Sequence, residues 1–199
     1  MGRQRLAQGQ KNARRRGAVI CFFDESGVSL TPIVRSTWAP RGKTPVLVHR
    51  FNWQRASIAA ALCFGSAGGG CRLAFHVQPG SYNTQRLIVV LQELRRLLGG
   101  QKATLVWDGL PAHRSKAMQA FLASQRHWLV AERLPGYAPE LNPTEALWGH
   151  LKGKGGELAN LAGDTLEEVI GAAQRGIDRV RRTPHLPYSF LRRSGLDLW

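Results

Sequence analysis

Three acidic residues in distant parts of the chain have the surroundings expected of metal ligands. Asp24 ends the apolar run AVICFFD, Asp108 ends the apolar run ATLVWD, and Glu145 follows within the segment PGYAPELNPTEALWGHLK. A carboxylate at the end of a buried strand lies at a sheet edge, where α/β proteins place functional groups. If the two strands are neighbours, the three carboxylates could share one metal site. Such a site would cut phosphodiester bonds.

Asp24 also has a structural interpretation, because Ser26 and Gly27 follow it and favour a turn. Its neighbour Glu25 competes with it for a place in the site. Successive side chains of a strand point to opposite faces, so only one of the pair is expected to face the site. We assign Asp24 to the site and Glu25 to an accessory or purely structural position.

Asp108 and Gly109 form a pair that is typical of a tight hairpin. A hairpin needs a second strand, whereas the chain continues with Pro111, the candidate N-cap Ser115 and a helix-forming run. The sequence therefore predicts a strand, a loop and a helix, with Asp108 at the end of the strand. His113 in this loop could assist at the phosphate, or it could be a solvent-exposed loop residue.

Glu145 has the strongest structural alternative. Asn142, Pro143 and Glu145 match the N-cap, first and third positions of a capping box. The surrounding prolines nevertheless favour a rigid loop that presents Glu145 on the first turn of a helix over residues 143–152. Lys152 lies two turns further along the same side and could contact phosphate. The buried stripe of this helix is predicted to be Leu147, Trp148 and Leu151.

The ligand types indicate the metal. Two divalent ions about 3.5 to 4 Å apart can activate the attacking water and relieve charge on the leaving oxygen. Carboxylate oxygens suit Mg²⁺ or Mn²⁺, so the expected cofactor is two such ions held by Asp24, Asp108 and Glu145. Zinc is not favoured, because the six histidines show no ligand-like pairing.

The charge of the chain indicates a polyanionic partner. The net charge is +15 and the isoelectric point is near 11.1, and residues 1–17 carry six basic and no acidic side chains. Clustered Lys and Arg release counterions from nucleic acid, so double-stranded DNA is the expected partner, with a merely solvated basic surface as the alternative. Trp38 could also touch DNA. The candidate phosphate contacts are Arg41, Lys43, Arg114, Lys116 and Lys152.

Hydrophobic patterns predict one α/β domain over residues 18–199, preceded by a basic arm, linker or helix tail over residues 1–17. Strands are expected at 18–24, 45–50, 55–64, 71–77, 103–107 and 128–132, and helices from residue 84, near 115–124, at 143–152 and near 164–182. The GSAGGG turn favours an antiparallel hairpin. We expect a mixed five-stranded sheet with helices on both faces.

The sequence favours a cytoplasmic protein. Its longest apolar run, residues 58–64, is too short to span a bilayer, and no apolar stretch follows the amino-terminal charges as in a signal peptide. The three cysteines lack CxxC spacing and lie in apolar runs, as buried reduced thiols do. With DNA as the partner, the expected location is the nucleoid.

Four segments carry a family resemblance: FFDESG, RSTWAPRGKTP, LVWDGLPAHRS and LPGYAPELNPTEALWGHLK. From about residue 14 to its end, the chain resembles the catalytic domain of bacterial insertion-sequence transposases of the mariner type, which are DDE superfamily endonucleases. The resemblance implies a ribonuclease H-like fold in which Asp24, Asp108 and Glu145 bind the metals. It also implies cleavage at the ends of a mobile element, followed by strand transfer into target DNA at a TA dinucleotide.

One departure from that family concerns DNA recognition. Its members carry helix-turn-helix modules upstream, and 17 residues cannot hold one such module. The chain is therefore expected either to work with an upstream helix-turn-helix half from a split reading frame, or to be a truncated remnant that only binds DNA. The closing segment SFLRRSGLDLW could pack an apolar end or support a homodimer.

Overall fold

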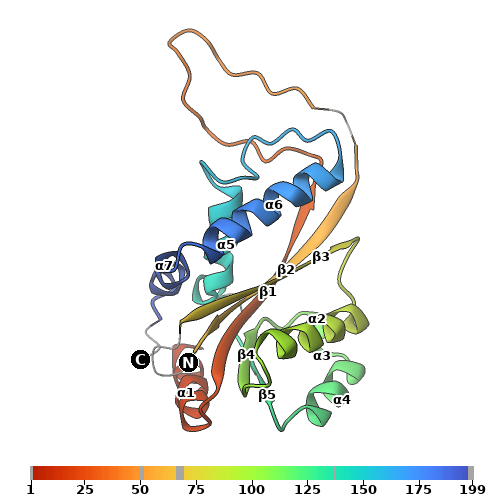
Figure 1. The fold of residues 1–199 in the computed structure, drawn as a ribbon, viewed down its shortest axis with the longest axis vertical. Helices are drawn as coiled ribbons and strands as arrows, with labels where there is room; N and C mark the ends of the chain where they lie inside the picture. The colour runs from red at the N-terminus through yellow and green to blue at the C-terminus, as the bar shows by residue number, and fades with distance from the viewer. Residues whose placement is uncertain (1, 50–51, 66–69, 137, 197–199) are drawn as a thin grey trace.

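The computed structural model describes residues 2–49, 52–65, 70–136 and 138–196. Its centre is a mixed five-stranded sheet in the order β3-β2-β1-β4-β5 (Figure 1). The antiparallel part pairs β1 with β2 and β2 with β3, and β1, β4 and β5 run parallel. The prediction of a mixed five-stranded sheet is confirmed. The strands are β1 (Val19–Ser29), β2 (Arg55–Phe64), β3 (Cys71–Pro79), β4 (Ala103–Trp107) and β5 (Leu129–Arg133).

Helices cover both faces of the sheet, as predicted (Figure 1). One face packs against α2 (Thr84–Leu97), α3 (Pro111–Arg114) and α4 (Lys116–Ser124). The opposite face packs against α5 (Pro143–Lys152), α6 (Leu166–Arg181) and α7 (His185–Arg193), and the short 3₁₀ helix η2 (Pro139–Leu141) precedes α5. Residues Gly2–Arg15 form α1, which packs against β1 and β4.

The apolar run at the start of β1 explains the two-layer core. Its alternating side chains place Ile20 and Phe22 in the core against α5, α6 and α7, and Cys21 and Phe23 in the core against α2 and α4. A strand that is buried on both faces has a continuous apolar run, and the strand at 18–24 was predicted from this pattern. The strand continues to Ser29, so Asp24 lies within β1 and the alternative of a turn at Ser26 and Gly27 is wrong.

Local signals predicted the positions of α2, α4, α5 and α6. Ser115 caps α4 by accepting a hydrogen bond of 3.1 Å from the backbone N–H of Met118. Leu87, Val90, Leu91 and Leu94 recur at helical spacing in α2 and are buried, whereas Leu97 is 42% exposed. The four-residue helix α3 and the helix α7 were not predicted. No helix in the described ranges is long and apolar enough to cross a membrane.

The predicted strand at 45–50 is wrong over residues 45–49, and residue 50 lies outside the described ranges. These residues belong to a long connection between β1 and β2 that extends away from the sheet (Figure 1). Val46 and Val48 are 84% and 82% exposed there. Without a neighbouring strand, the β-branched residues have no ladder to join, and Pro45 cannot donate to one. The predicted antiparallel pairing of β2 with β3 is confirmed, while residues 66–69 of the GSAGGG turn are not described.

Candidate active site

The three predicted carboxylates line one cavity. Asp24 from β1, Asp108 from the loop after β4 and Glu145 from the first turn of α5 border a cavity of about 690 Å³. The cavity opens where β4 ends beside β1, because the parallel pairing of these two strands stops at Phe22 and Val106. Strands β1 and β4 are therefore neighbours, which is the condition under which Asp24 and Asp108 were expected to share a site.

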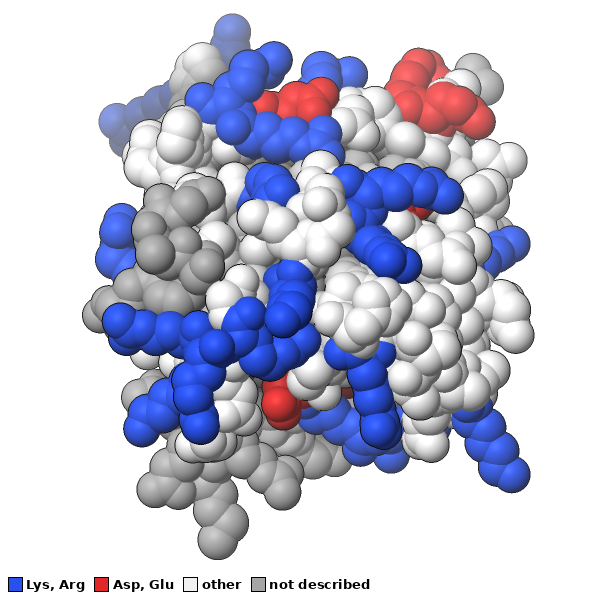
Figure 2. Space-filling model, turned by 60° about the horizontal axis from the view of Figure 1, so that its bottom comes forward, with Lys and Arg blue, Asp and Glu red and all other residues white. Residues whose placement is uncertain are grey.

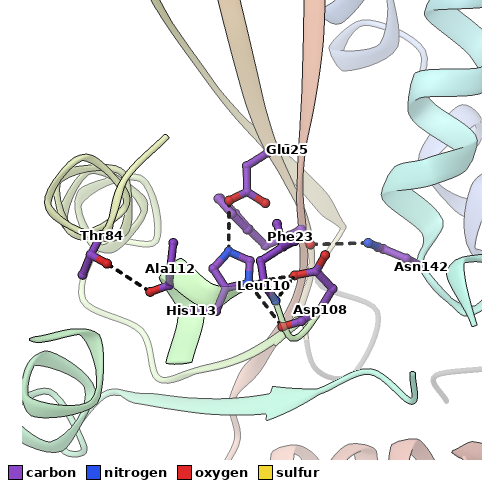
Figure 3. Close-up of polar contacts among 8 residues, drawn as sticks. All are labelled: Phe23, Glu25, Thr84, Asp108, Leu110, Ala112, His113 and Asn142. Carbon is purple, nitrogen blue, oxygen red and sulfur yellow. Dashed lines mark hydrogen bonds and ion pairs between the residues drawn. The ribbon is translucent and has the colours of Figure 1, made fainter. Parts of the chain in front are cut away.

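Two buried side chains fix the start of α5 on β1. The hydroxyl of Thr144 donates a hydrogen bond of 2.8 Å to the backbone oxygen of Phe22. The side-chain amide of Asn142 donates to the backbone oxygen of Phe23 at 3.4 Å (Figure 3). Asn142 also accepts from the backbone N–H of Thr144, so it is the predicted N-cap of α5. Together these bonds bring the first turn of α5 against the strand that carries Asp24.

The predicted capping box is only half formed. The backbone N–H of Asn142 donates to the carbonyl of Pro139 at 2.9 Å, in place of the carboxylate of Glu145. Glu145 is exposed at the edge of the cavity. Its carboxylate therefore remains available to a ligand, although the local sequence favoured a structural use.

Asp24 lies in the most buried part of the site. Its exposed fraction is 9%, and its Oδ2 accepts a hydrogen bond of 2.9 Å from the indole N–H of Trp148. Burial raises the pKa of Asp24 to about 7, the negative charge of Glu145 adds to this effect, and the Trp148 hydrogen bond opposes it. The charges of Glu25 and Asp108 raise this pKa further. The site thus concentrates negative charge that a cation would relieve.

A histidine bridge joins Asp108 to Glu25 on the other side of β1 (Figure 3). His113 Nδ1 lies 2.8 Å from Oδ1 of Asp108, and His113 Nε2 lies 3.0 Å from Oε1 of Glu25. The same Oδ1 accepts a hydrogen bond of 3.0 Å from the backbone N–H of Leu110. The imidazole stacks on Trp107 at 4.1 Å between ring centres. These contacts occupy one oxygen of Asp108 and fix the orientation of its carboxylate.

His113 is 4% exposed, so the alternative of a solvent-exposed loop histidine is wrong. Burial lowers the pKa of His113, but the hydrogen bonds with Asp108 and Glu25 outweigh burial and raise it to about 9. For Asp108, burial raises the pKa, and the hydrogen bonds from His113 and Leu110 more than offset this and lower it. The raised pKa favours the imidazolium form of His113 at neutral pH.

The predicted phosphate contacts are spread over the molecule. Arg114 lines the cavity, and so does Arg133, which sequence reasoning did not single out. Lys116 is exposed at the start of α4. The ammonium group of Lys152 donates to Ser26 Oγ at 2.5 Å and to the backbone oxygen of Gly27 at 2.8 Å. Lys152 therefore already has two partners on β1.

Of the predicted DNA contacts, only Arg114 lines the cavity. Arg41 and Lys43 are exposed on the long connection between β1 and β2. Trp38 lies on the same connection and is 88% exposed, with Lys154 Nζ 4.7 Å from its ring centre. These residues are not among those that border the carboxylates.

Two observations qualify the sequence-based site. Trp148 was predicted only as a core residue, and its donation to Asp24 depends on how α5 packs on β1, which the sequence does not reveal. Among the described residues, no three His, Cys, Asp or Glu side chains lie close enough together, in their present conformations, to hold one metal ion. Asp24 nevertheless lies within electrostatic reach of both Glu145 and Asp108.

Comparisons with known proteins agree with this architecture. The sequence profile of the family described as DDE superfamily endonuclease matches residues 19–163. The Mos1 transposase paired-end complex with left transposon end is 19% identical with a TM-score of 0.56, covering 98% of this chain and 62% of that chain. The Mos1 mariner paired-end complex with Mn is 19% identical with a TM-score of 0.52, covering 96% and 61% respectively.

The catalytic domain of Mos1 mariner transposase is also similar, at 17% identity and a TM-score of 0.51, covering 99% of this chain and 94% of that chain. At these identities the likeness concerns the fold, which is ribonuclease H-like as predicted. The chain spans less than two thirds of the length of the transposase in the two paired-end complexes. None of the curated proteins compared with the sequence matches it.

Proposed function

Because the chain belongs to the DDE superfamily endonucleases, we propose that it is a transposase catalytic domain that cuts DNA and transfers the cut strand to new DNA. One observation carries this proposal: three carboxylates from β1, the loop after β4 and α5 line a single cavity. In this proposal Asp24, Asp108 and Glu145 are the catalytic residues. The substrate is the double-stranded end of a mobile element, and the target contains a TA dinucleotide.

The donor set of the cavity fits divalent metal. Three carboxylates supply the hard oxygen ligands that Mg²⁺ and Mn²⁺ prefer. The raised pKa of Asp24, caused by burial and then by the charge of Glu145, indicates negative charge that the protein does not neutralise there. We propose that these residues hold two Mg²⁺ or Mn²⁺ ions, and the Mn-bound Mos1 paired-end complex supports this choice of metal. When bound, such ions activate the attacking oxygen and stabilise the leaving oxygen.

The residues that support or line the cavity have defined tasks in this proposal. Trp148 and Thr144 keep α5 against β1, so that Glu145 and Asp24 border the same space. The bridge between Glu25 and His113 is accessory, because it orients Asp108 and leaves its second oxygen for a ligand. Arg114 and Arg133 would contact phosphates of the DNA in the cavity. An upstream helix-turn-helix half and a second copy of the chain remain proposed partners.

The alternative is a remnant that binds DNA without cutting it. The observation that favours this alternative is that no three ligand-type side chains in the described ranges are placed to hold one ion together. In the active enzyme, a rotamer change of Glu145 on metal binding would complete the ligand set, because Glu145 is exposed while His113 and Leu110 hold the carboxylate of Asp108 in place. A remnant would bind DNA and leave it uncut when Mg²⁺ or Mn²⁺ is present.

Nicking of supercoiled plasmid in the presence of Mg²⁺ or Mn²⁺ distinguishes the two functions. The wild-type chain should nick the plasmid, and Asp108→Asn and Glu145→Gln should each reduce the rate at least ~100-fold, since each removes a metal ligand. Glu140→Gln is the matched control, because Glu140 is an exposed acid on η2 that does not line the cavity. Equal rates for Asp108→Asn and wild type would overturn the assignment of the site. Binding without nicking in every variant would establish the remnant.

A further inference from the structure

The end of the sheet opposite the carboxylates carries a basic surface that the proposed active site does not use. Four segments build it: residues 14–19, 70–73, 94–103 and 124–129. Three of them meet through the backbone, since Val19 donates to Lys102 at 2.8 Å and Ala103 donates to Trp128 at 2.7 Å. The segment 70–73 joins them through Arg72, whose guanidinium donates to the backbone oxygen of Leu97 at 3.2 Å. These segments contain no Asp or Glu, and their basic residues, which we call the basic face, are Arg14, Arg15, Arg16, Arg72, Arg95, Arg96, Lys102 and Arg126.

Figure 2 shows the molecule with the end that holds α1 turned forward. Lys and Arg side chains spread across this view, with few Asp and Glu side chains among them. All but Arg16 and Arg72 of the basic face are classed as exposed, and these two are partly exposed. The positive charge of the basic face is therefore accessible to a macromolecular partner.

Several of these guanidinium groups are held in place by neutral groups. Arg16 donates to Thr104 Oγ1 at 3.4 Å and to the backbone oxygen of Trp128 at 3.5 Å. Arg95 lies 5.6 Å from the ring centre of Trp128 and donates to Gln125 Oε1 at 3.4 Å. Neutral partners orient an arginine without cancelling its charge, which lowers the entropy cost of binding an anion.

The basic face is too far from the carboxylates to act on the same phosphates. Lys102 precedes β4 and Asp108 follows it, so six residues at about 3.3 Å each separate them by about 20 Å. That distance corresponds to roughly six base pairs of duplex at 3.4 Å per pair. The carboxylate end also repels phosphate when no metal is bound, whereas the basic face attracts it at all times.

We propose that the basic face is a metal-independent docking surface for the phosphate backbone of double-stranded DNA, and that it holds a segment other than the one at the carboxylates. The choice of duplex DNA rests on the proposed function. Such docking would raise the local concentration of DNA and fix its direction relative to the cavity. Its energy comes from counterion release and so depends steeply on salt.

Salt-dependent binding tests this proposal directly. Fluorescence anisotropy of a labelled 16-base-pair duplex is measured in EDTA between 50 and 200 mM salt, for wild type and for Lys102→Glu with Arg126→Glu. Both residues are exposed. The double variant should lower the slope of log K against log salt by about 2 and weaken binding roughly 10- to 100-fold at 0.1 M salt. Arg55→Glu with Arg175→Glu is the control, since both residues are exposed, carry the same charge change and lie on β2 and α6 outside the four segments of the basic face.

The outcomes separate this proposal from the proposed function. If the two double variants lose binding equally, or if single-stranded RNA competes better than duplex DNA, the docking surface is wrong. This comparison does not depend on plasmid nicking. A catalytically silent chain would still show the difference in the slope of log K against log salt between the two double variants. An active chain could nick plasmid and still lack that difference. Circular dichroism melting checks folding, and Lys102→Gln with Arg126→Gln replaces the charge reversals if they prevent it.

Discussion

The indole N–H of Trp148 donates a hydrogen bond of 2.9 Å to Oδ2 of Asp24. Trp148 lies three residues after Glu145 on α5, so both side chains lie on the same face of the helix. Glu145 supplies a carboxylate to the cavity, and Trp148 donates a hydrogen bond to the carboxylate of Asp24. The tryptophan is 4% exposed and packs in the core between the sheet and α5. The geometry of the site therefore depends on core packing as well as on the acids themselves.

Trp148→Phe should keep most of the packing and remove this donor. Because the hydrogen bond lowers the pKa of Asp24, it stabilises the ionised form, and its loss should cost more at pH 9 than at pH 5. We expect a loss of about 1 to 3 kcal/mol at pH 9, measured by urea unfolding in EDTA. Trp128→Phe is the control, because its indole donates to the neutral Gln125 at 2.9 Å. A loss at Trp148 that does not change with pH would contradict the prediction.

Asp24→Asn should stabilise the metal-free protein at high pH. The pKa of Asp24 is raised from 3.8 to about 7, chiefly by burial, so the folded state binds this proton more tightly than the unfolded state. The contribution of Asp24 to stability is then most favourable below pH 4 and is lost as pH rises to about 7. At pH 8 the ionised side chain should cost up to about 4 kcal/mol, which the asparagine variant avoids.

Urea unfolding of wild type and Asp24→Asn at pH 5 and pH 8, both in EDTA, measures this cost. The advantage of the variant should grow between the two pH values, and added Mn²⁺ should stabilise only wild type. An advantage that stays constant with pH would show that Asp24 titrates in its ordinary range.

The imidazolium bridge should stabilise the protein at neutral pH. The pKa of His113 is about 9, because its bonds with Asp108 and Glu25 outweigh the lowering effect of burial. A raised histidine pKa gives stability that is complete below about 6.5 and is lost as pH rises through 9. His113→Gln should therefore cost about 2 to 3 kcal/mol at pH 7 and less at pH 10, measured by urea unfolding in EDTA.

His185→Gln serves as the control for the bridge, since His185 is exposed at the start of α7. This variant should follow the pH dependence of wild type. If His113→Gln costs the same at both pH values, the histidine acts by packing on Trp107 and not by its charge.

Two glycines of α6 should respond in opposite directions to alanine. A Cβ on Gly176 would overlap Leu151 Cδ2 and lie 2.6 Å from Glu157 Oε2, so Gly176→Ala should destabilise the protein by about 1 to 3 kcal/mol. A Cβ on Gly171 would meet only Arg175 Nη1, at 3.5 Å. Gly171→Ala should therefore stabilise by about 0.5 to 1 kcal/mol through helix propensity. Thermal unfolding of both variants checks this, and equal effects would show that α6 does not pack closely on α5.

The sequence predicted well wherever a short-range rule applied. The helix over residues 143–152 and its Asn142 cap were read from the order Asn, Pro and Glu, and α4 was read from its cap at Ser115. The strand before Asp24 was read from its apolar run. The prediction of a strand at 45–49 was wrong because a strand needs a neighbouring strand, which residue types alone do not reveal.

The sequence by itself determined where most strands and helices form, since periodicity, capping and turn chemistry act over a few residues. It did not determine the end of β1, which lies at Ser29 instead of Asp24. Only the tertiary structure decided how those ends meet. Trp148 reaches Asp24 across 124 positions of chain, and His113 reaches Glu25 across 88. These contacts arise from the packing of α5 and α3 on opposite sides of β1, and packing depends on the whole core rather than on any local segment.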